Sequence, residues 1–204
     1  SCANGTDAIY IALKSLDIGV GDEVITVANT WISTAETISQ TGAEPIFVDI
    51  DPKTYNIDTS MIEEKITKKT KAIIPVHLFG QAVKMDEIRD LCNRYSLFLI
   101  EDCAQAHFAQ YKGQYVGTFG DSGTFSFYPG KNLGAYGDAG GIITNNDEYA
   151  SRMRMFANHG SLVKHEHQIL GINSRMDGIQ AAILNVKLKH IKNWTKSRIN
   201  NASY

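Results

Sequence analysis

A lysine, Lys131, stands among glycines directly after the strand-like segment Ser122 to Phe127. A lysine at the end of an apolar strand suits a Schiff base better than a solvated surface. An acid, Asp102, ends a second and very apolar segment, Leu97 to Glu101. A buried amine and a buried acid at neighbouring strand ends suit pyridoxal phosphate, because the lysine can hold its aldehyde and the carboxylate its ring nitrogen. Lys131 and Asp102 are therefore the candidate catalytic residues.

Short apolar strands alternate with amphipathic helices along the chain. Ser60 and Glu63 form a capping-box pattern, which predicts a helix that ends near Thr67. The other helices are expected at Asp7–Leu16, Ser33–Thr41, Met85–Tyr95, Glu148–Asn158 and from about Met176 to about Ile191. The strands are expected at Glu23–Val27, Pro45–Asp49, Ala72–Val76, Leu97–Glu101, Thr124–Phe127 and Gly141–Thr144.

This alternation predicts an α/β fold. Right-handed crossovers between successive strands give a mostly parallel sheet flanked by helices on both faces. Ligands of such sheets bind beyond the carboxyl ends of the strands, which is where Asp102 falls. The 204 residues contain no repeat and no linker, so the chain fits one domain with a sizeable core.

The composition is that of an ordinary globular protein, with 43% hydrophobic residues and a net charge of -2. This charge argues against nucleic-acid binding, and we interpret the basic cluster from Lys65 to Lys71 as a solvated helix end. No apolar run approaches the length of about 18 residues that would indicate a membrane span. The three cysteines, Cys2, Cys92 and Cys103, fit reduced thiols in a cytoplasm and show no zinc spacing.

Two nucleotide-binding motifs are approximated but not matched. The segment from Gly123 to Lys131 resembles a P-loop, but too many residues separate its glycines, and Asn132 stands where Ser or Thr should bind magnesium. The segment Gly19-Val20-Gly21 lacks a third glycine and precedes a strand, so we interpret it as a turn. The pattern His165-Glu166-His167 lies in a polar loop and is assigned no metal.

Several further motifs occur together and in order. They are Asn4-Gly5-Thr6, the run from Glu101 to His107, Gly120-Asp121, the run from Phe125 to Asp138, Asn158-His159-Gly160 and Gly171-x-Asn173-x-Arg175-Met176. Over essentially the whole chain they resemble the nucleotide-sugar aminotransferases of pyridoxal-phosphate fold type I. The run around Lys131 is most similar to the subgroup that aminates C3 of dTDP-linked 3-keto-6-deoxyhexoses.

The resemblance implies ping-pong transamination, with glutamate as amino donor and a keto-sugar nucleotide as acceptor. Lys131 would form the Schiff base and, once displaced, would move the proton between the substrate carbon and the cofactor. The resemblance also implies a cytoplasmic homodimer, and residues 1–204 would be the large domain of an aspartate aminotransferase-like enzyme. Because the chain begins with Ser1 rather than Met, we expect a fragment without the start of that domain and without the C-terminal small domain.

The candidate phosphate ligands are Gly5, Thr6, Ser126 and Asn173. Gly5 and Thr6 precede a helix, whose N-terminus can hold a phosphate, and the alternative role of Thr6 is a simple N-cap. Ser126 matches the family's phosphate-binding serine. Asn173 matches an asparagine that reaches the phosphate of the neighbouring subunit in the family, and its alternative role is a turn or a helix cap.

The candidate ring contacts are Asp102, Gln105 and Trp31. Asp102 would keep the ring nitrogen protonated, because opposite charges favour each other's charged form. Gln105 matches a glutamine that binds the ring hydroxyl, and Trp31 could stack on the ring or simply pack in the core. Phe108 stands where the family usually has a small residue, and we expect its ring to narrow the space beside the cofactor.

Three competing functions remain open. Sugar dehydratases that use pyridoxal phosphate share the fold but carry histidine at the position of Lys131. Other enzymes of fold type I, such as cysteine desulfurases or Cβ–S lyases, would need the lysine but not the run from Asp102 to Gln105. A catalytically silent regulator would keep the fold for partner binding, with no need for Lys131, Asp102 and Ser126 together.

Overall fold

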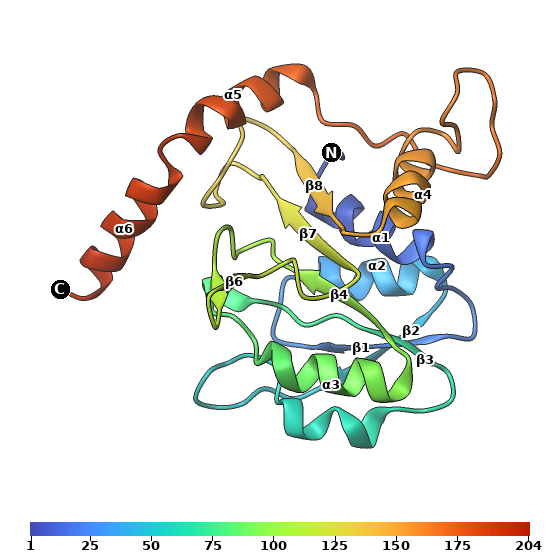
Figure 1. The fold of residues 1–204 in the computed structure, drawn as a ribbon, viewed down its shortest axis with the longest axis horizontal. Coiled ribbons are helices and arrows are strands. Elements are labelled where there is room, and N and C mark those ends of the chain that lie inside the picture. Colours follow the sequence, from blue (N-terminus) through green and yellow to red (C-terminus); the bar gives the residue numbers. More distant parts are fainter.

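The computed structural model describes residues 1–204, with a six-stranded sheet at the centre (Figure 1). The strand order is β2-β1-β3-β4-β7-β8. The strands are β1 Glu23–Val27, β2 Glu44–Val48, β3 Thr70–Ile73, β4 Phe98–Asp102, β7 Ser122–Ser126 and β8 Gly140–Ile143. Neighbouring strands run parallel, except that β8 is antiparallel to β7. The predicted α/β fold with a mostly parallel sheet is confirmed.

Helices cover both faces of this sheet (Figure 1). The helices α1 (Gly5–Ser15), α2 (Ser33–Thr41) and α4 (Asp147–Ala157) contribute to one hydrophobic cluster, and α3 (Met85–Tyr95) contributes to a second. Adjacent strand residues alternate between the clusters, because successive side chains of a strand point to opposite faces. Ile100 packs on the α1 side and Leu99 on the α3 side. The strands are therefore apolar on both faces, as the sequence indicates.

A short hairpin lies between β4 and β7, where the sequence predicts no helix or strand. Its strands are β5 (Gln110–Tyr111) and β6 (Gln114–Tyr115), which pair antiparallel. Gly113 at the turn has a φ of 85°, a left-handed conformation that favours glycine. The hairpin follows β4 directly and leads back to the sheet at β7.

The prediction of a helix from the capping-box pattern of Ser60 and Glu63 is wrong. The side chain of Asp58 accepts hydrogen bonds from the backbone N–H of Ser60 at 3.0 Å and from its hydroxyl at 2.6 Å. Asp58 therefore takes the capping role, and the chain forms two 3-10 turns, η1 (Thr59–Met61) and η2 (Glu63–Lys65). A third such turn, η3 (Leu78–Gly80), follows β3.

The helix predicted from about Met176 to about Ile191 is observed with slightly shorter bounds, but a second closing helix was not predicted. The structure has two helices there, α5 (Gly178–Leu188) and α6 (Ile191–Ala202). Ile191 is buried and packs in a small cluster with Leu184, and the chain turns just before it. The direction of α6 is set by this tertiary contact, and α6 extends away from the sheet (Figure 1). No helix combines the length and apolar character needed to cross a bilayer.

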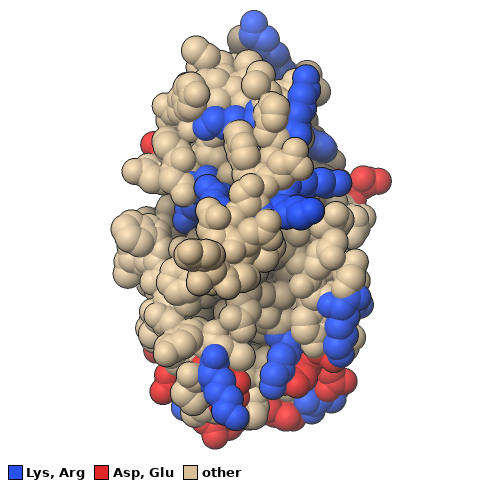
Figure 2. Space-filling view, turned by 90° about the vertical axis from the view of Figure 1, so that its left-hand side faces the viewer, with Lys and Arg blue, Asp and Glu red and all other residues tan.

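The charges are unevenly distributed over the surface. The segment from Gly178 to Tyr204, which contains α5 and α6, carries five Lys or Arg residues and no Asp or Glu. On the side shown in Figure 2, the charged side chains of the upper half are mostly basic, whereas acidic and basic side chains mix at the lower end. The basic residues of this segment are Lys187, Lys189, Lys192, Lys196 and Arg198.

Candidate active site

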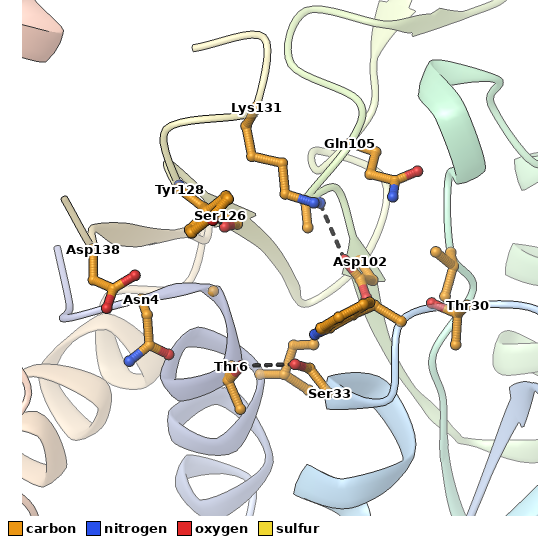
Figure 3. A pocket seen from close by; sticks show the side chains of 15 residues that line it. Asn4, Thr6, Thr30, Ser33, Asp102, Gln105, Ser126, Tyr128, Lys131 and Asp138 are labelled. Carbon is orange, nitrogen blue, oxygen red and sulfur yellow. Dashed lines mark hydrogen bonds between the residues drawn. The ribbon is translucent and has the colours of Figure 1, made fainter. Parts of the chain in front are cut away.

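A cavity of about 400 Å³ opens at the carboxyl ends of β1, β3, β4 and β7 (Figure 3). The N-terminal ends of α1 and α2 close it from the other side. This is the edge at which parallel α/β sheets bind ligands. The lining residues are Asn4, Gly5, Thr6, Ile9, Thr30, Trp31, Ser33, Val76, Asp102, Ala104, Gln105, Ser126, Tyr128, Lys131 and Asp138.

The cavity brings together seven of the eight site residues predicted from the sequence. They come from four separate parts of the chain. The seven are Gly5, Thr6, Trp31, Asp102, Gln105, Ser126 and Lys131.

Asp102 is the last residue of β4 and is 5% exposed. Its Oδ2 atom accepts a hydrogen bond from the Thr34 hydroxyl at 2.9 Å, and Oδ1 accepts one from the Ala104 N–H at 3.1 Å. Burial raises the pKa of Asp102, and these two hydrogen bonds act in the opposite direction. A cationic N–H group in the cavity would stabilise the carboxylate further. Nothing in the sequence pattern singled out Thr34, which lies 68 positions from Asp102.

The N-terminus of α1 forms an anion cradle with Ser126. Asn4 caps the helix by accepting from the Asp7 N–H at 2.8 Å, so Thr6 is not the N-cap and the N–H groups of Gly5 and Thr6 have no intrahelical partner. A Cβ atom on Gly5 would lie 2.5 Å from Ser126 Cβ, so only glycine allows this approach. The Thr6 and Ser33 hydroxyls are 2.7 Å apart. Free N–H groups, hydroxyls and a helix N-terminus in one place fit a phosphate.

The side chain of Lys131 points into the cavity from the loop between β7 and β8 (Figure 3). Its backbone N–H donates to the Tyr128 carbonyl at 2.8 Å. The dashed lines in Figure 3 mark the Thr6–Ser33 bond and the bond from the Ala104 N–H to Asp102. Lys131 and Asp102 thus face one space from the ends of neighbouring strands.

Trp31 and Gln105 lie at the rim of the cavity. Trp31 is 72% exposed, so it does not pack in the core. The Gln105 side-chain oxygen accepts a hydrogen bond from the Phe79 N–H at 2.8 Å, which fixes the amide and leaves its NH2 group to donate elsewhere. Phe79 has a φ of 53° and was not singled out in the sequence.

Asn173 and Phe108 lie outside the cavity. Asn173 is exposed and forms a backbone bridge with Asn158. The expectation that Phe108 narrows the cavity is wrong. Its φ of 63° and an edge-on contact with Tyr115, with 6.0 Å between ring centroids, place it against the hairpin.

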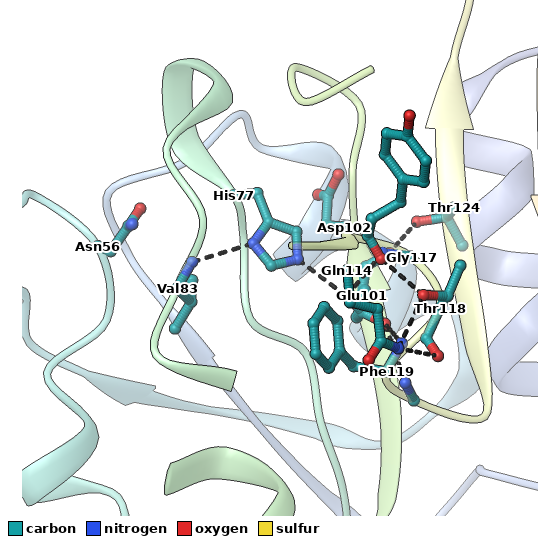
Figure 4. A network of polar contacts seen from close by, with 12 residues as sticks. Asn56, His77, Val83, Glu101, Asp102, Gln114, Gly117, Thr118, Phe119 and Thr124 are labelled. Atoms are coloured by element: carbon teal, nitrogen blue, oxygen red, sulfur yellow. Dashed lines mark hydrogen bonds and ion pairs between the residues drawn. The ribbon is translucent and has the colours of Figure 1, made fainter. Parts of the chain in front are cut away.

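A buried carboxylate, Glu101, supports the cavity from the opposite face of β4 (Figure 4). Its Oε1 atom accepts from the N–H groups of Phe119 at 2.7 Å and Gly120 at 2.9 Å. Its Oε2 atom accepts from the Gly117 N–H at 2.7 Å and lies 3.1 Å from His77 Nε2. His77 Nδ1 accepts from the Val83 N–H, so Nε2 carries the hydrogen and donates to Glu101.

The possible ligand atoms of His77, Glu101 and Cys103 lie within 4.8 Å of one another. Glu101 is already surrounded by four donors, and His77 uses both ring nitrogens. Burial raises the pKa of the Cys103 thiol, which disfavours the thiolate that would bind a metal. We interpret the three residues as part of a structural network.

We predict that Glu101→Gln destabilises the protein by about 3 kcal/mol. An amide NH2 group cannot accept hydrogen bonds, so in either orientation it would leave two donors without a partner. Chemical denaturation measures the loss. The control is Glu64→Gln, an exposed acid beside Lys65, for which we expect a change below about 0.5 kcal/mol. Equal losses in the two variants would contradict the structural role of Glu101.

Comparison with known proteins gives consistent matches over the whole chain. The model of the DegT/DnrJ/EryC1/StrS aminotransferase family matches residues 1–204. A pleiotropic regulatory protein of Geobacillus stearothermophilus is 54% identical over 99% of this chain and 54% of its own length. The dTDP-3-amino-3,6-dideoxy-alpha-D-galactopyranose transaminase of Aneurinibacillus thermoaerophilus is 51% identical over 99% of this chain and 56% of its own.

A solved structure also has a closely similar fold. The crystal structure of S. venezuelae DesV in complex with a ketimine intermediate matches with a TM-score of 0.97 and 43% identity, over 99% of this chain and 54% of DesV. The chain spans about half the length of the curated relatives it matches. With the family model matched from end to end, the chain belongs to the DegT/DnrJ/EryC1/StrS aminotransferase family.

Proposed function

We propose that the protein is a pyridoxal-phosphate-dependent aminotransferase that acts on a nucleotide-linked keto-sugar. The observation that carries this proposal is the convergence of Lys131, Asp102 and the anion cradle of Gly5, Thr6 and Ser126 on one cavity. An amine, a buried acid and a phosphate site are the three groups that this cofactor requires.

Each residue has a defined part in this proposal. Lys131 Nζ would hold the cofactor's aldehyde carbon, Asp102 its ring nitrogen, and Gly5, Thr6 and Ser126 its phosphate. When bound, pyridoxal phosphate supplies an electron sink for the C–H bond that breaks. Lys131 Nζ, once free, removes the proton from the carbon that bears the donor's amino group.

Trp31 and Gln105 would orient the cofactor from the cavity rim. The Trp31 ring can cover one face of an aromatic ligand, because most of its surface is open to solvent. Gln105 can donate its NH2 group to a ring hydroxyl while the Phe79 N–H holds its oxygen.

The substrate pair in this proposal is glutamate and a dTDP-3-keto-6-deoxyhexose. The names of several relatives, which are transaminases of dTDP-linked 3-amino sugars, support this choice. We propose further that residues 1–204 are the large cofactor-binding domain of a cytoplasmic homodimer. Three buried free cysteines agree with a reducing compartment.

The alternatives differ from this proposal at Lys131. A sugar dehydratase of this fold would carry histidine there, and a silent regulator would not need the amine. One relative is named a pleiotropic regulatory protein, so the regulator is the alternative that an experiment has to exclude.

We predict that Lys131→Ala abolishes transamination and the visible absorbance of protein-bound pyridoxal phosphate. Borohydride reduction followed by peptide mass spectrometry should tag Lys131 in the unchanged protein, because the reduced bond is stable. Lys196→Ala, a change at an exposed lysine, is the control and should leave both readouts unchanged. A tag on another lysine, or no tag at all, would reject the proposal.

We predict that Asp102→Asn slows proton transfer by about 100-fold or more. Asn keeps the shape and the acceptor for the Ala104 N–H but lacks the charge that favours a protonated ring nitrogen. Single-turnover kinetics with glutamate measures the rate, and titration with pyridoxal phosphate should show retained binding. Asp177→Asn, at an exposed position, is the control. Unchanged turnover in Asp102→Asn would remove Asp102 from the mechanism.

We predict that Asn173 completes the phosphate site of a second copy of the chain. A twofold interface would let each subunit give one Asn173 and receive one, and Asn173 is exposed outside its own cavity. Asn173→Ala should weaken cofactor binding about tenfold, and dilution to monomer should have a similar effect in the unchanged protein. Fluorescence titration and ultracentrifugation measure these effects. Tight binding by the monomer would contradict the prediction, as would a dimer structure with Asn173 remote from every phosphate.

A further inference from the structure

The loop that carries Lys131, residues 128–138, has no regular secondary structure and is held by α5. The Tyr136 N–H donates to the side-chain oxygen of Gln180 on α5 at 2.9 Å. About two turns further along α5, the ammonium group of Lys187 donates to the Gly134 carbonyl at 2.6 Å. The Lys187 nitrogen also lies 4.4 Å from the centroid of the Tyr136 ring.

Holding Gly134 also holds the start of the loop. A Cβ atom on Gly134 would lie 2.4 Å from the Pro129 carbonyl oxygen, so the loop is folded tightly back on itself. On α6, the Arg198 guanidinium donates to the side chain of Asn132, the residue after Lys131. The lysine loop is therefore bonded to both closing helices, at Asn132, Gly134 and Tyr136, which all follow Lys131.

A small apolar cluster joins the same elements. Leu133 and Ala135 from the loop, and Ala139 directly after it, pack with Leu184 of α5 and Ile191 of α6. This cluster is separate from the two clusters on the faces of the sheet. The position of the loop is thus set by the closing helices as much as by the sheet.

We infer that Lys187 is a positioning residue for Lys131, acting through the Gly134 carbonyl. This inference rests on the proposed function, in which Lys131 Nζ must meet an aldehyde carbon. The half-buried, charge-assisted bond to Gly134 fixes a loop that has few backbone partners of its own. Without it the loop samples other conformations, and the Lys131 amine spends less time within reach of the cofactor.

The experiment compares Lys187→Met, Lys187→Arg and Lys189→Met. Met keeps an unbranched side chain but loses the donor and the charge, Arg keeps both, and Lys189 is an exposed neighbour. Hydrogen exchange is followed at the amides of Lys131 and Ala135, which bond to Tyr128 and Phe127, with the Asp102 amide as internal control. The second readout is the rate at which borohydride traps pyridoxal phosphate on Lys131.

In Lys187→Met, loop exchange should accelerate and trapping should slow, each by about tenfold, with no change at the Asp102 amide. Lys187→Arg and Lys189→Met should match the unchanged protein. The inference is overturned if Lys187→Met leaves the loop amides unchanged, or if exchange accelerates equally at Asp102. If the unchanged protein traps no cofactor, the proposed function fails, whereas the exchange comparison still decides whether Lys187 holds the loop.

Discussion

Two consecutive carboxylates, Glu101 and Asp102, end the central strand β4, and the organisation of the site depends on how each is satisfied. A buried charge is tolerated only when it is paired or hydrogen-bonded. Glu101 has four donors, three of them backbone N–H groups of the segment that leads into β7. Asp102 has two donors and faces the cavity. Neighbouring residues of a strand thus divide support and chemistry between the two faces of the sheet.

Hydrogen bonds of His77 also link the segment after β3 to the end of β4. The His77 ring donates to the Glu101 carboxylate, and the backbone N–H of His77 donates to the Asp102 carbonyl at 3.1 Å. Asp102 therefore cannot shift without disturbing the Glu101 network. The other half of the site is assembled differently, because Gly5 and Ser126 meet by the close packing of α1 against β7. A rigid acid and a preformed anion cradle leave the lysine loop as the part of the site that the closing helices control.

Local patterns predicted the elements best. The helix α2 and the strand β1 were predicted at their observed bounds, since burial and turn residues mark them within a few positions, as at Gly42 with its φ of 90°. The sequence could not reveal contacts between distant residues. Thr34 meets Asp102 across 68 positions, and the capping box at Ser60 failed because Asp58 competes for it. The seven residues in the cavity were found because a whole set of motifs, rather than one residue, located them.

The exposure of Trp31 has a spectroscopic consequence. The chain has two tryptophans, and both are open to solvent, Trp31 at 72% and Trp194 at 40%. Trp194 also stacks on His190, with 5.7 Å between the ring centroids, so unfolding changes the surroundings of Trp194 more than those of the exposed Trp31. An aromatic ligand stacked on Trp31 would instead quench the emission of Trp31 directly. Intrinsic fluorescence thus reports occupancy of the cavity through Trp31, whereas unfolding should register mainly through Trp194.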